Sequence, residues 1–245
     1  MLISVGARCL NEEELLPIFL KNHQFADEIV VCDGGSTDRS KEIALSDPKV
    51  VWVDFPYRVP SMGGHPEITM NPEGKHVNAV IDACRGEWLY ITEVDVVPDL
   101  AMQDAIRDVI RLAKSPAIGS YLYYVAPMKS PGSPYEYYPA LIQGWGLTCW
   151  HKDIGLKVPT EVCENLSDPC AWPLKSKTWE NNQNNKNVII MDRPSGRVHL
   201  TWCTRERVQN CIKKYALRDN RNIPDPDTYL TRALLPDWIV WNGMY

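Results

Sequence analysis

The sequence lacks several signals that would assign it to common protein classes. It has no run of about 18 apolar residues, so we expect no membrane-spanning helix. No G-x-G-x-x-G follows any apolar run, which disfavours a dinucleotide-dependent dehydrogenase. A sugar-1-phosphate nucleotidyltransferase is a further option, but a Gly-rich fingerprint after the first strand is missing. Residues 2–7 form a short apolar run without a preceding cationic segment, which predicts a strand and not a signal peptide.

The cysteines also lack the spacing of a metal site or a redox motif. Eight are scattered along 245 residues and none forms a C-x-x-C pair. Since no secretory signal is expected, we interpret them as reduced thiols of a cytoplasmic protein. A zinc site built from Cys163 and Cys170 with distant partners remains an alternative, although the spacing matches no common zinc finger.

The composition is that of an ordinary globular protein with a local excess of positive charge. Hydrophobic residues make up 44% and charged residues 23%, so the chain can bury a sizeable core. The formal net charge is −5, which excludes a uniformly basic nucleic-acid coat. Residues 197–221 nevertheless hold seven Lys or Arg and two acidic residues, which indicates either a polyanionic partner or a solvated helix face.

Strand-like and helix-like segments alternate along the first half of the chain. Apolar runs at residues 2–7, 28–32, 50–53 and 88–92 predict strands, and helices are expected between them and after Pro98. Asn11 with Glu14 resembles a capping box for the first helix. Such alternation predicts a mostly parallel sheet whose ligands bind at the carboxyl ends of the strands.

Acidic residues stand at the ends of two of these predicted strands. Asp33 ends the second strand, and Glu93 and Asp95 end the fourth. Topology alone would bring these carboxylates to one edge of the sheet, where hard oxygen ligands suit Mg²⁺ or Mn²⁺ bridging to phosphate. The Pro- and Gly-rich segment 56–74, between the third strand and the next helix, has the composition of a lid.

Taken together, these segments resemble a known family. The resemblance rests on Asn11-Glu12-Glu13, on DEIVVCDGGSTDRS at 27–40, on residues 75–78 and on GEWLYITEVD at 86–95. In order and spacing they are similar to the family 2 nucleotide-sugar glycosyltransferases, in particular to the lipopolysaccharide-core glucosyltransferase-like branch. The resemblance implies the GT-A fold, a Rossmann-like α/β fold with a mostly parallel central sheet flanked by helices and a smaller acceptor-side region.

The resemblance also implies a division of the chain. Residues 1–200 would form the GT-A domain, with a nucleotide-sugar half at 1–100 and an acceptor half at 101–200. Residues 201–245 would form a C-terminal helical extension packed on it.

The family pattern assigns donor-binding and metal-binding roles to residues of this sequence. Asp95 would ligate Mn²⁺ or Mg²⁺, with Glu93 near the metal or the ribose, although the family usually has Asp where Glu93 stands. Arg197 would lie beside the diphosphate, and His199 would complete the metal shell. The remaining donor-binding residues implied are Arg8, Cys9, Leu10, Glu12, Asp33, Gly34, Lys75, Asn78 and Val94. An acidic residue after the segment 144–146, Glu164 or Asp168, would be the catalytic base.

Each assignment has a structural alternative that the sequence leaves open. Asn11 can be only a helix cap, and Asp33 and Asp38 can be satisfied turn residues. Glu93 and Asp95 can be a solvated strand end, and a lone His such as His199 is more often structural than a ligand. The tyrosines around residues 121–138 suit either a sugar-binding surface or a hairpin core, and their strand propensity favours the hairpin.

Two functions follow as hypotheses. The first is a metal-dependent hexosyltransferase that moves a hexose from a nucleotide diphosphate sugar, expected to be a UDP-sugar, to an acceptor hydroxyl. The acceptor would be a glycan or a lipid-linked sugar, or a hydroxymethylated DNA base if the basic segment binds nucleic acid. The second is a non-catalytic nucleotide- or glycan-binding module on the same fold.

Overall fold

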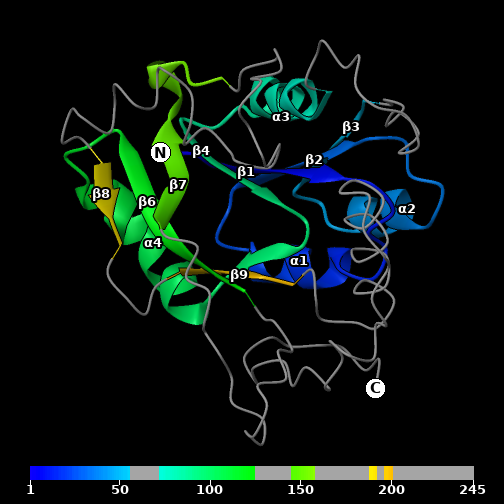
Figure 1. The fold of residues 1–245 in the computed structure, drawn as a ribbon, viewed down its shortest axis with the longest axis horizontal. Coiled ribbons are helices and arrows are strands. Elements are labelled where there is room, and N and C mark those ends of the chain that lie inside the picture. The colour runs from blue at the N-terminus through cyan, green and yellow to red at the C-terminus, as the bar shows by residue number, and fades with distance from the viewer. Residues whose placement is uncertain (56–71, 125–144, 158–187, 192–195, 201–245) are drawn as a thin grey trace, which may run out of the picture.

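The described strands form a single mixed sheet. A computed structural model of the chain describes residues 1–55, 72–124, 145–157, 188–191 and 196–200. Within these ranges the strand order is β3-β2-β1-β4-β7-β6-β9-β5, with β8 paired to β6 (Figure 1). The elements are β1 (Ile3–Cys9), α1 (Leu16–Asn22), β2 (Glu28–Asp33), α2 (Ser40–Leu45), β3 (Val50–Asp54), α3 (Pro72–Ala83), β4 (Trp88–Glu93), β5 (Val96–Pro98), α4 (Leu100–Leu112), β6 (Ala117–Tyr124), β7 (Trp145–His151), the 3₁₀ turn η1 (Lys152–Ile154), β8 (Val188–Ile190) and β9 (Gly196–His199).

The central part of the sheet is mostly parallel, as the alternating pattern predicts. Strand β1 is paired in parallel with β2 on one side and β4 on the other, and β2 is paired in parallel with β3. Strand β7 is antiparallel to both β4 and β6, so β6 runs in the direction of the first four strands. Strands β6 and β7 pair antiparallel. The aromatic residues that these two segments contain therefore lie in strands, as their strand propensity predicts.

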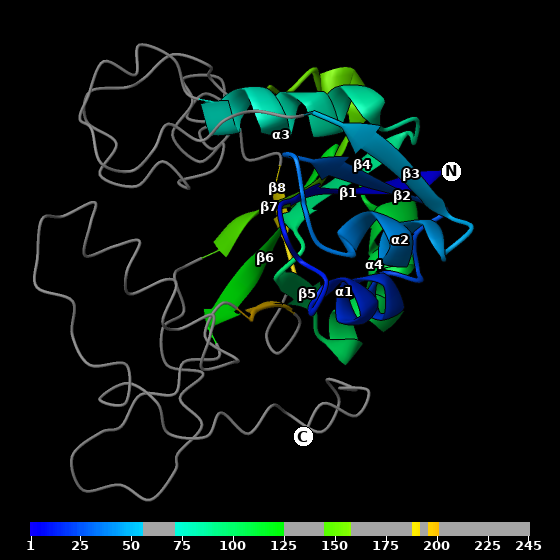
Figure 2. The ribbon, with the colours of Figure 1, turned by 90° about the vertical axis from the view of Figure 1, so that its right-hand side faces the viewer.

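Helices cover both faces of this sheet (Figure 2). Ile3, Val5 and Ala7 alternate along β1 and are buried in one hydrophobic cluster with apolar residues of α1 and α4. Gly6 faces the other side, where a Cβ atom would lie 2.4 Å from Cγ1 of Val80 in α3. The missing side chain at this position therefore allows α3 to pack closely against β1.

The element boundaries confirm most of the sequence pattern and correct it at two helix starts. The predicted capping box at Asn11 is wrong, because α1 begins at Leu16 with Leu15 at its N-cap and no side-chain cap. Asn11 instead has a φ of 53° and lies in the preceding loop. Helix α3 begins at Pro72, before the predicted start at Lys75, since proline suits the first turn of a helix.

The predicted C-terminal extension at 201–245 and residues 56–71 of the predicted lid-like segment 56–74 lie outside the described residues, whereas residues 72–74 belong to α3. Within the described ranges, none of the helices has the length and hydropathy needed to cross a bilayer.

A buried carboxylate joins three elements at the amino end of the parallel strands. The Glu28 carboxylate accepts hydrogen bonds from Ser4 Oγ at 2.5 Å, Arg85 N at 2.9 Å and Arg85 Nε at 2.5 Å, and its side chain is 4% exposed. Ser4 Oγ in turn accepts the Gly86 N–H at 2.7 Å. Burial raises the pKa of Glu28, whereas the hydrogen bonds from Ser4 and Arg85 and the charge of Arg85 lower it. The lowering effects are together larger, so the pKa lies below its ordinary value.

We expect Glu28→Gln to destabilise the fold in a pH-dependent manner. A buried charged hydrogen-bond acceptor is lost, so the free energy of unfolding at pH 7 should fall by about 1–3 kcal/mol. Because the folded-state pKa is lowered, the wild-type advantage is complete above the ordinary pKa of 4.5 and disappears as the pH falls through the folded-state value. Urea unfolding at a series of pH values measures this difference.

Glu42→Gln is the matched control, because Glu42 pairs with Arg39 in an exposed i,i+3 bridge whose side chains are both 69% exposed. This control should leave stability nearly unchanged. A difference in unfolding free energy between Glu28→Gln and wild type that does not change with pH would contradict the lowered pKa of Glu28.

Candidate functional site

The parallel register brings the ends of β1, β2 and β4 together at one edge of the sheet. Arg8 is paired with Cys32 in β2 and with Glu93 in β4, and Cys9 is paired with Asp33. This is the edge at which α/β sheets bind their ligands. The predicted donor-binding residues of the first two strand ends are therefore neighbours.

An ion pair connects two of these strand ends. Arg8 Nη2 donates a hydrogen bond to Glu93 Oε1, and the two side chains are 14% and 22% exposed. Residues two apart in a strand point to the same face of the sheet. Arg8 therefore shares the α3 face with Gly6, and Glu93 shares it with the buried Ile91. The structure thus pairs a predicted donor-binding residue with a predicted metal ligand.

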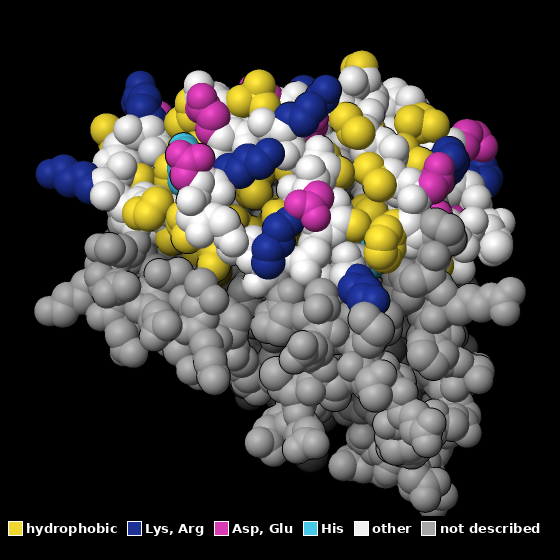
Figure 3. All heavy atoms as spheres, turned by 90° about the horizontal axis from the view of Figure 1, so that it is seen from above, with side chains coloured by type: hydrophobic (Ala, Val, Ile, Leu, Met, Phe, Trp, Pro, Cys, Tyr) yellow, Lys and Arg dark blue, Asp and Glu magenta, His cyan; other side chains and the backbone are white. Residues whose placement is uncertain are grey.

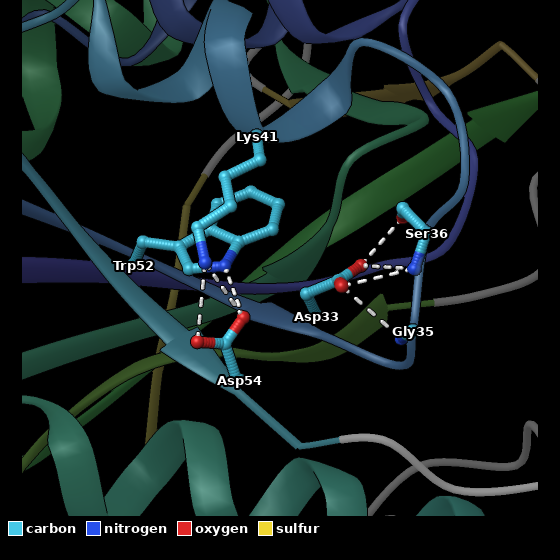
Figure 4. Close-up of polar contacts among 6 residues, drawn as sticks. All are labelled: Asp33, Gly35, Ser36, Lys41, Trp52 and Asp54. Carbon is cyan, nitrogen blue, oxygen red and sulfur yellow. Dashed lines mark hydrogen bonds and ion pairs between the residues drawn. The ribbon is translucent and has the colours of Figure 1, made fainter.

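Asp33 is held within its own turn. Its carboxylate accepts the N–H of Gly35 at 3.1 Å, the N–H of Ser36 at 2.9 Å and the Ser36 hydroxyl at 2.5 Å (Figure 4). Gly34 N donates to Cys9 O at 2.8 Å, which ties this turn to the end of β1. The turn alternative for Asp33 therefore describes this structure, and contact of Asp33 and Gly34 with a base stays a prediction.

Figure 4 also shows a second carboxylate, on the neighbouring edge strand. Asp54 accepts hydrogen bonds from Lys41 Nζ at 3.0 Å and from Trp52 Nε1 at 2.8 Å. These contacts and the Trp52 ring, which lies 5.7 Å from Lys41 Nζ, fix the end of β3 against α2. The cluster lowers the pKa of Asp54 through the hydrogen bonds from Trp52 and Lys41.

The loop after β1 and the turn after β2 bind each other through reciprocal hydrogen bonds, and we call this arrangement the loop clasp (residues 10–13 with 36–40). Backbone N–H groups of the first loop donate to side chains of the second. The bonds are Asn11 N to Ser36 Oγ at 2.8 Å, Glu12 N to Ser40 Oγ at 2.9 Å and Glu13 N to Asp38 Oδ2 at 3.1 Å.

The loop clasp also runs in the opposite direction. Asn11 Oδ1 accepts the Thr37 N–H at 2.8 Å, and Glu13 Oε2 accepts the Arg39 N–H at 3.1 Å. The Asn-Glu-Glu and Ser-Thr-Asp-Arg-Ser motifs therefore satisfy each other's backbone groups. Sequence reasoning missed Ser40, since nothing in its local pattern indicates a partner 28 residues away.

Cys9 lies beneath the loop clasp. Burial raises the pKa of its thiol to about 12, opposed by hydrogen bonds involving Ser40 and Ser36. Cys9 is therefore a neutral, buried thiol at physiological pH. Leu10 and Glu12 lie in the loop above it, with Leu10 38% exposed.

The N-terminal part of α3 reaches the same edge. A ring nitrogen of His76, Nε2, lies 2.7 Å from Cys32 O at the end of β2, and the imidazole stacks on Phe55 with ring centroids 5.4 Å apart. This contact positions Lys75, which is exposed, and Asn78, which is half-buried, on the first turns of the helix. Sequence reasoning gave His76 no role, because its partner is a backbone carbonyl that no motif marks.

The predicted metal ligands gather around the turn between β4 and β5. Asp95 O accepts the Leu200 N–H at 2.6 Å, and Val96 is paired with His199 across the antiparallel β5 and β9. The backbone of residue 199 thus lies beside Asp95, although the His199 side chain is not among those described. Val94 is 1% exposed and packs in the core.

The described side chains include no group of three or more His, Cys, Asp or Glu that could hold a metal ion. Asp95 is a hard oxygen ligand at the turn and therefore fits a divalent cation, whereas the Glu93 carboxylate is bound to a guanidinium.

Arg197 is half-buried and lies in β9, which pairs with β6 on one side and β5 on the other. Its Nε donates to Ser120 Oγ at 3.1 Å, and that hydroxyl shares a 2.7 Å hydrogen bond with Thr148 Oγ1. Burial raises the pKa of the nearby Tyr90, and the positive charge of Arg197 opposes the shift. The position of Arg197 beside a diphosphate stays a prediction. The catalytic candidates Glu164 and Asp168 lie outside the described residues.

The surface on the α3 side carries mixed charge. Figure 3 shows Lys and Arg interspersed with Asp and Glu over the described part of this face. The basic segment that suggested a nucleic-acid partner begins at Arg197 and, after residue 200, lies outside the described residues.

Comparison with known proteins supports the fold. The sequence matches no family model and no curated protein. Its structure is similar to that of S. aureus TarS residues 1–349 in complex with UDP-GlcNAc, with a TM-score of 0.52 and 15% identity over 93% of this chain and 69% of that chain. For the TarS complex with UDP the TM-score is 0.51, with 15% identity over 93% and 68%.

A mannosyltransferase from Pyrobaculum calidifontis, in complex with GDP-Man and Mn²⁺, is more distant, with a TM-score of 0.46 and 15% identity over 92% of this chain and 66% of that chain. The similarity to TarS and the sheet topology confirm the predicted GT-A fold. The lipopolysaccharide-core branch stays a prediction.

We expect Ser40→Ala to open the loop clasp. Ser40 is fully buried, and its loss leaves the Glu12 N–H without this acceptor, which should cost about 1 kcal/mol of stability. The direct readout is amide hydrogen exchange, which should accelerate at Glu12.

Ser46→Ala is the control, because Ser46 Oγ donates to Ile43 O at the other end of α2. Exchange at Glu12 should not change in this variant. An unchanged Glu12 exchange rate in Ser40→Ala would show that the clasp does not hold the loop.

Proposed function

We propose that this protein is a nucleotide-sugar glycosyltransferase whose donor binds at the carboxyl edge formed by β1, β2, β4 and the first turns of α3. The observation that carries the proposal is the pairing of Arg8 with Glu93 at this edge, two residues before Asp95, in a fold shared with a protein whose solved structure contains UDP-GlcNAc. The expected reaction is transfer of a hexose from a UDP-sugar to an acceptor hydroxyl.

In this proposal, different residues of the edge contact different parts of the donor. The loop clasp, with Leu10 and Glu12 on its surface, borders the nucleoside, and Lys75 and Asn78 approach it from α3. Asp95 holds Mn²⁺ or Mg²⁺, together with His199 and with Glu93 as the family pattern implies. A bound divalent ion supplies Lewis-acid stabilisation of the leaving diphosphate.

The acceptor half supplies the remaining chemistry. Glu164 or Asp168 is the proposed general base, which removes the proton of the acceptor hydroxyl as it attacks the anomeric carbon. Arg197 is proposed to face the diphosphate. The carboxylate base would act on the acceptor, and the cationic group, together with the metal, would stabilise the negative charge of the leaving diphosphate.

The donor site is tested by thermal stability with UDP, GDP, CDP or ADP, each with and without Mn²⁺. A ligand that binds only the folded state stabilises it by about 2.7 kcal/mol at 100 times its dissociation constant. We expect one nucleotide, UDP, to give a Mn²⁺-dependent increase in Tm that Asp95→Asn loses.

Asp153→Asn is the matched control, since the Asp153 side chain is 90% exposed in η1, beyond the end of β7. It should respond to UDP like the wild type. A wild-type protein that no nucleotide stabilises would overturn the proposal. A protein that binds UDP-sugar but releases no UDP, with or without acceptors, would instead be the non-catalytic module.

The nature of the acceptor is tested through the basic segment. If the acceptor is a hydroxymethylated DNA base, Lys213→Glu with Lys214→Glu should weaken DNA binding at least tenfold, on the order expected for the loss of two phosphate contacts, and leave UDP binding intact. Lys21→Glu with Lys114→Glu, at two exposed lysines, is the control for net charge. Equal DNA affinity in the two double variants would favour a glycan or lipid-linked acceptor.

A further inference from the structure

The ion pair between Arg8 and Glu93 gives the Glu93 carboxylate a cationic partner within the protein. Arg8 Nη2 donates to Glu93 Oε1, and both side chains are largely shielded from solvent, at 14% and 22% exposure. The pair is also held by the backbone, since the two residues stand opposite each other in the register of β1 and β4. It is therefore a fixed feature of the donor edge.

The charge of Arg8 makes Glu93 a poor ligand for a divalent ion. The positive charge of the Arg8 guanidinium offsets the negative charge of the Glu93 carboxylate with which it is paired. A metal bound within about 2.0–2.2 Å of a Glu93 oxygen would lie beside this positive charge, in a partly desolvated site where repulsion is weakly screened. Asp95, two residues further on and in the turn, is the carboxylate better suited to the metal.

Arg8 itself lies at the edge of the sheet where ligands of α/β folds bind. It stands at the carboxyl edge of the parallel strands, and exposed Lys75 lies on the first turns of α3 at the same edge. The N-terminal end of this 12-residue helix adds partial positive charge. A planar guanidinium with a second cation at the same edge of the sheet matches a diphosphate better than it matches a neutral base or ribose.

We propose that Arg8 binds the diphosphate of the donor and that Glu93 is a positioning residue, which orients the Arg8 guanidinium and does not ligate the metal. This inference rests on the proposed function. It changes the role of Glu93 from a metal or ribose contact to a support for a phosphate-binding arginine, and it leaves Asp95 as the metal-binding carboxylate of the β4–β5 turn.

The test separates phosphate, base and metal contacts. UDP binding is measured by calorimetry, uridine binding by NMR titration, and Mn²⁺ binding to the UDP complex by electron paramagnetic resonance. If the nucleotide screen selects another base, the diphosphate and nucleoside of that base are used. The variants are Arg8→Gln, Glu93→Gln, their combination, and Asp95→Asn.

We expect Arg8→Gln and Glu93→Gln each to weaken UDP binding by about tenfold or more, and the double variant to lose no more than the single variants, because the pair acts as one unit. Uridine affinity should remain within about twofold of wild type in all three, since uridine has no phosphate for Arg8 to bind. Asp95→Asn should lose Mn²⁺ affinity, and Glu93→Gln should keep it within about threefold.

Glu93→Asp gives an independent answer. Shortening the side chain moves the carboxylate away from Arg8, so UDP binding should weaken although the charge is kept. If Glu93 were a metal ligand, aspartate would restore the usual family residue and Mn²⁺ binding would be equal or tighter, with no loss of UDP affinity.

The control is the second Arg–Glu pair of the same sheet, at its opposite edge. Arg85→Gln disturbs the Glu28 network and should lower stability without changing UDP affinity. A loss of Mn²⁺ affinity in Glu93→Gln as large as in Asp95→Asn would overturn the inference. Equal losses of UDP and uridine in Arg8→Gln would also overturn it. Failure of the wild type to bind any nucleotide would overturn the proposed function itself.

Discussion

The arrangement of the site depends on the position of β1 between two parallel partners. Because β1 is hydrogen-bonded to β2 and β4 along its length, the residues at its carboxyl end stand opposite the carboxyl ends of both neighbours. Arg8 meets Glu93 and Cys9 meets Asp33 for this reason alone. A shift of one residue in either pairing would place these side chains on opposite faces of the sheet.

Once the register is set, the strand ends form two clusters with different chemistry. On the α1 face, the loop clasp and the Asp33 turn satisfy backbone and carboxylate groups within the protein. On the α3 face, charged groups meet at the edge, and His76 fixes the first turns of α3 to the end of β2. The first cluster gives the loops a defined shape, and the second gathers charged groups at the edge where we propose that the donor binds.

The sequence predicts the elements of this fold well because their signals are local. The run of β-branched residues in β2 and the spacing of Met102, Ile106 and Ile110 in α4 suffice to place a strand and a helix, and all three α4 residues are buried. The order of such segments predicts the mostly parallel sheet, and the resemblance of the motifs to family 2 glycosyltransferases implies the GT-A fold. The roles of single polar residues are harder to predict, since their partners are distant in the chain.

Asn11 illustrates the difficulty. Its pattern with Glu14 satisfies the local rule for a helix cap, yet its side chain accepts a hydrogen bond from Thr37, 26 residues away. The partner of Glu93 is 85 residues away, so a motif that places an acidic pair at a strand end cannot show that one member is neutralised. Long-range pairing decided both cases.

The two Arg–Glu pairs of the sheet show how position alone changes the role of the same chemistry. Glu28 is 4% exposed at the amino edge, where Ser4 and the Arg85 backbone also bind its carboxylate, so its charge is satisfied within the protein. Arg8 and Glu93 stand at the carboxyl edge, where the chain turns away from the sheet after each strand and leaves space for a ligand. A salt bridge in the first position stabilises the fold, whereas one in the second holds a cation at the edge where, in our proposal, the donor diphosphate binds.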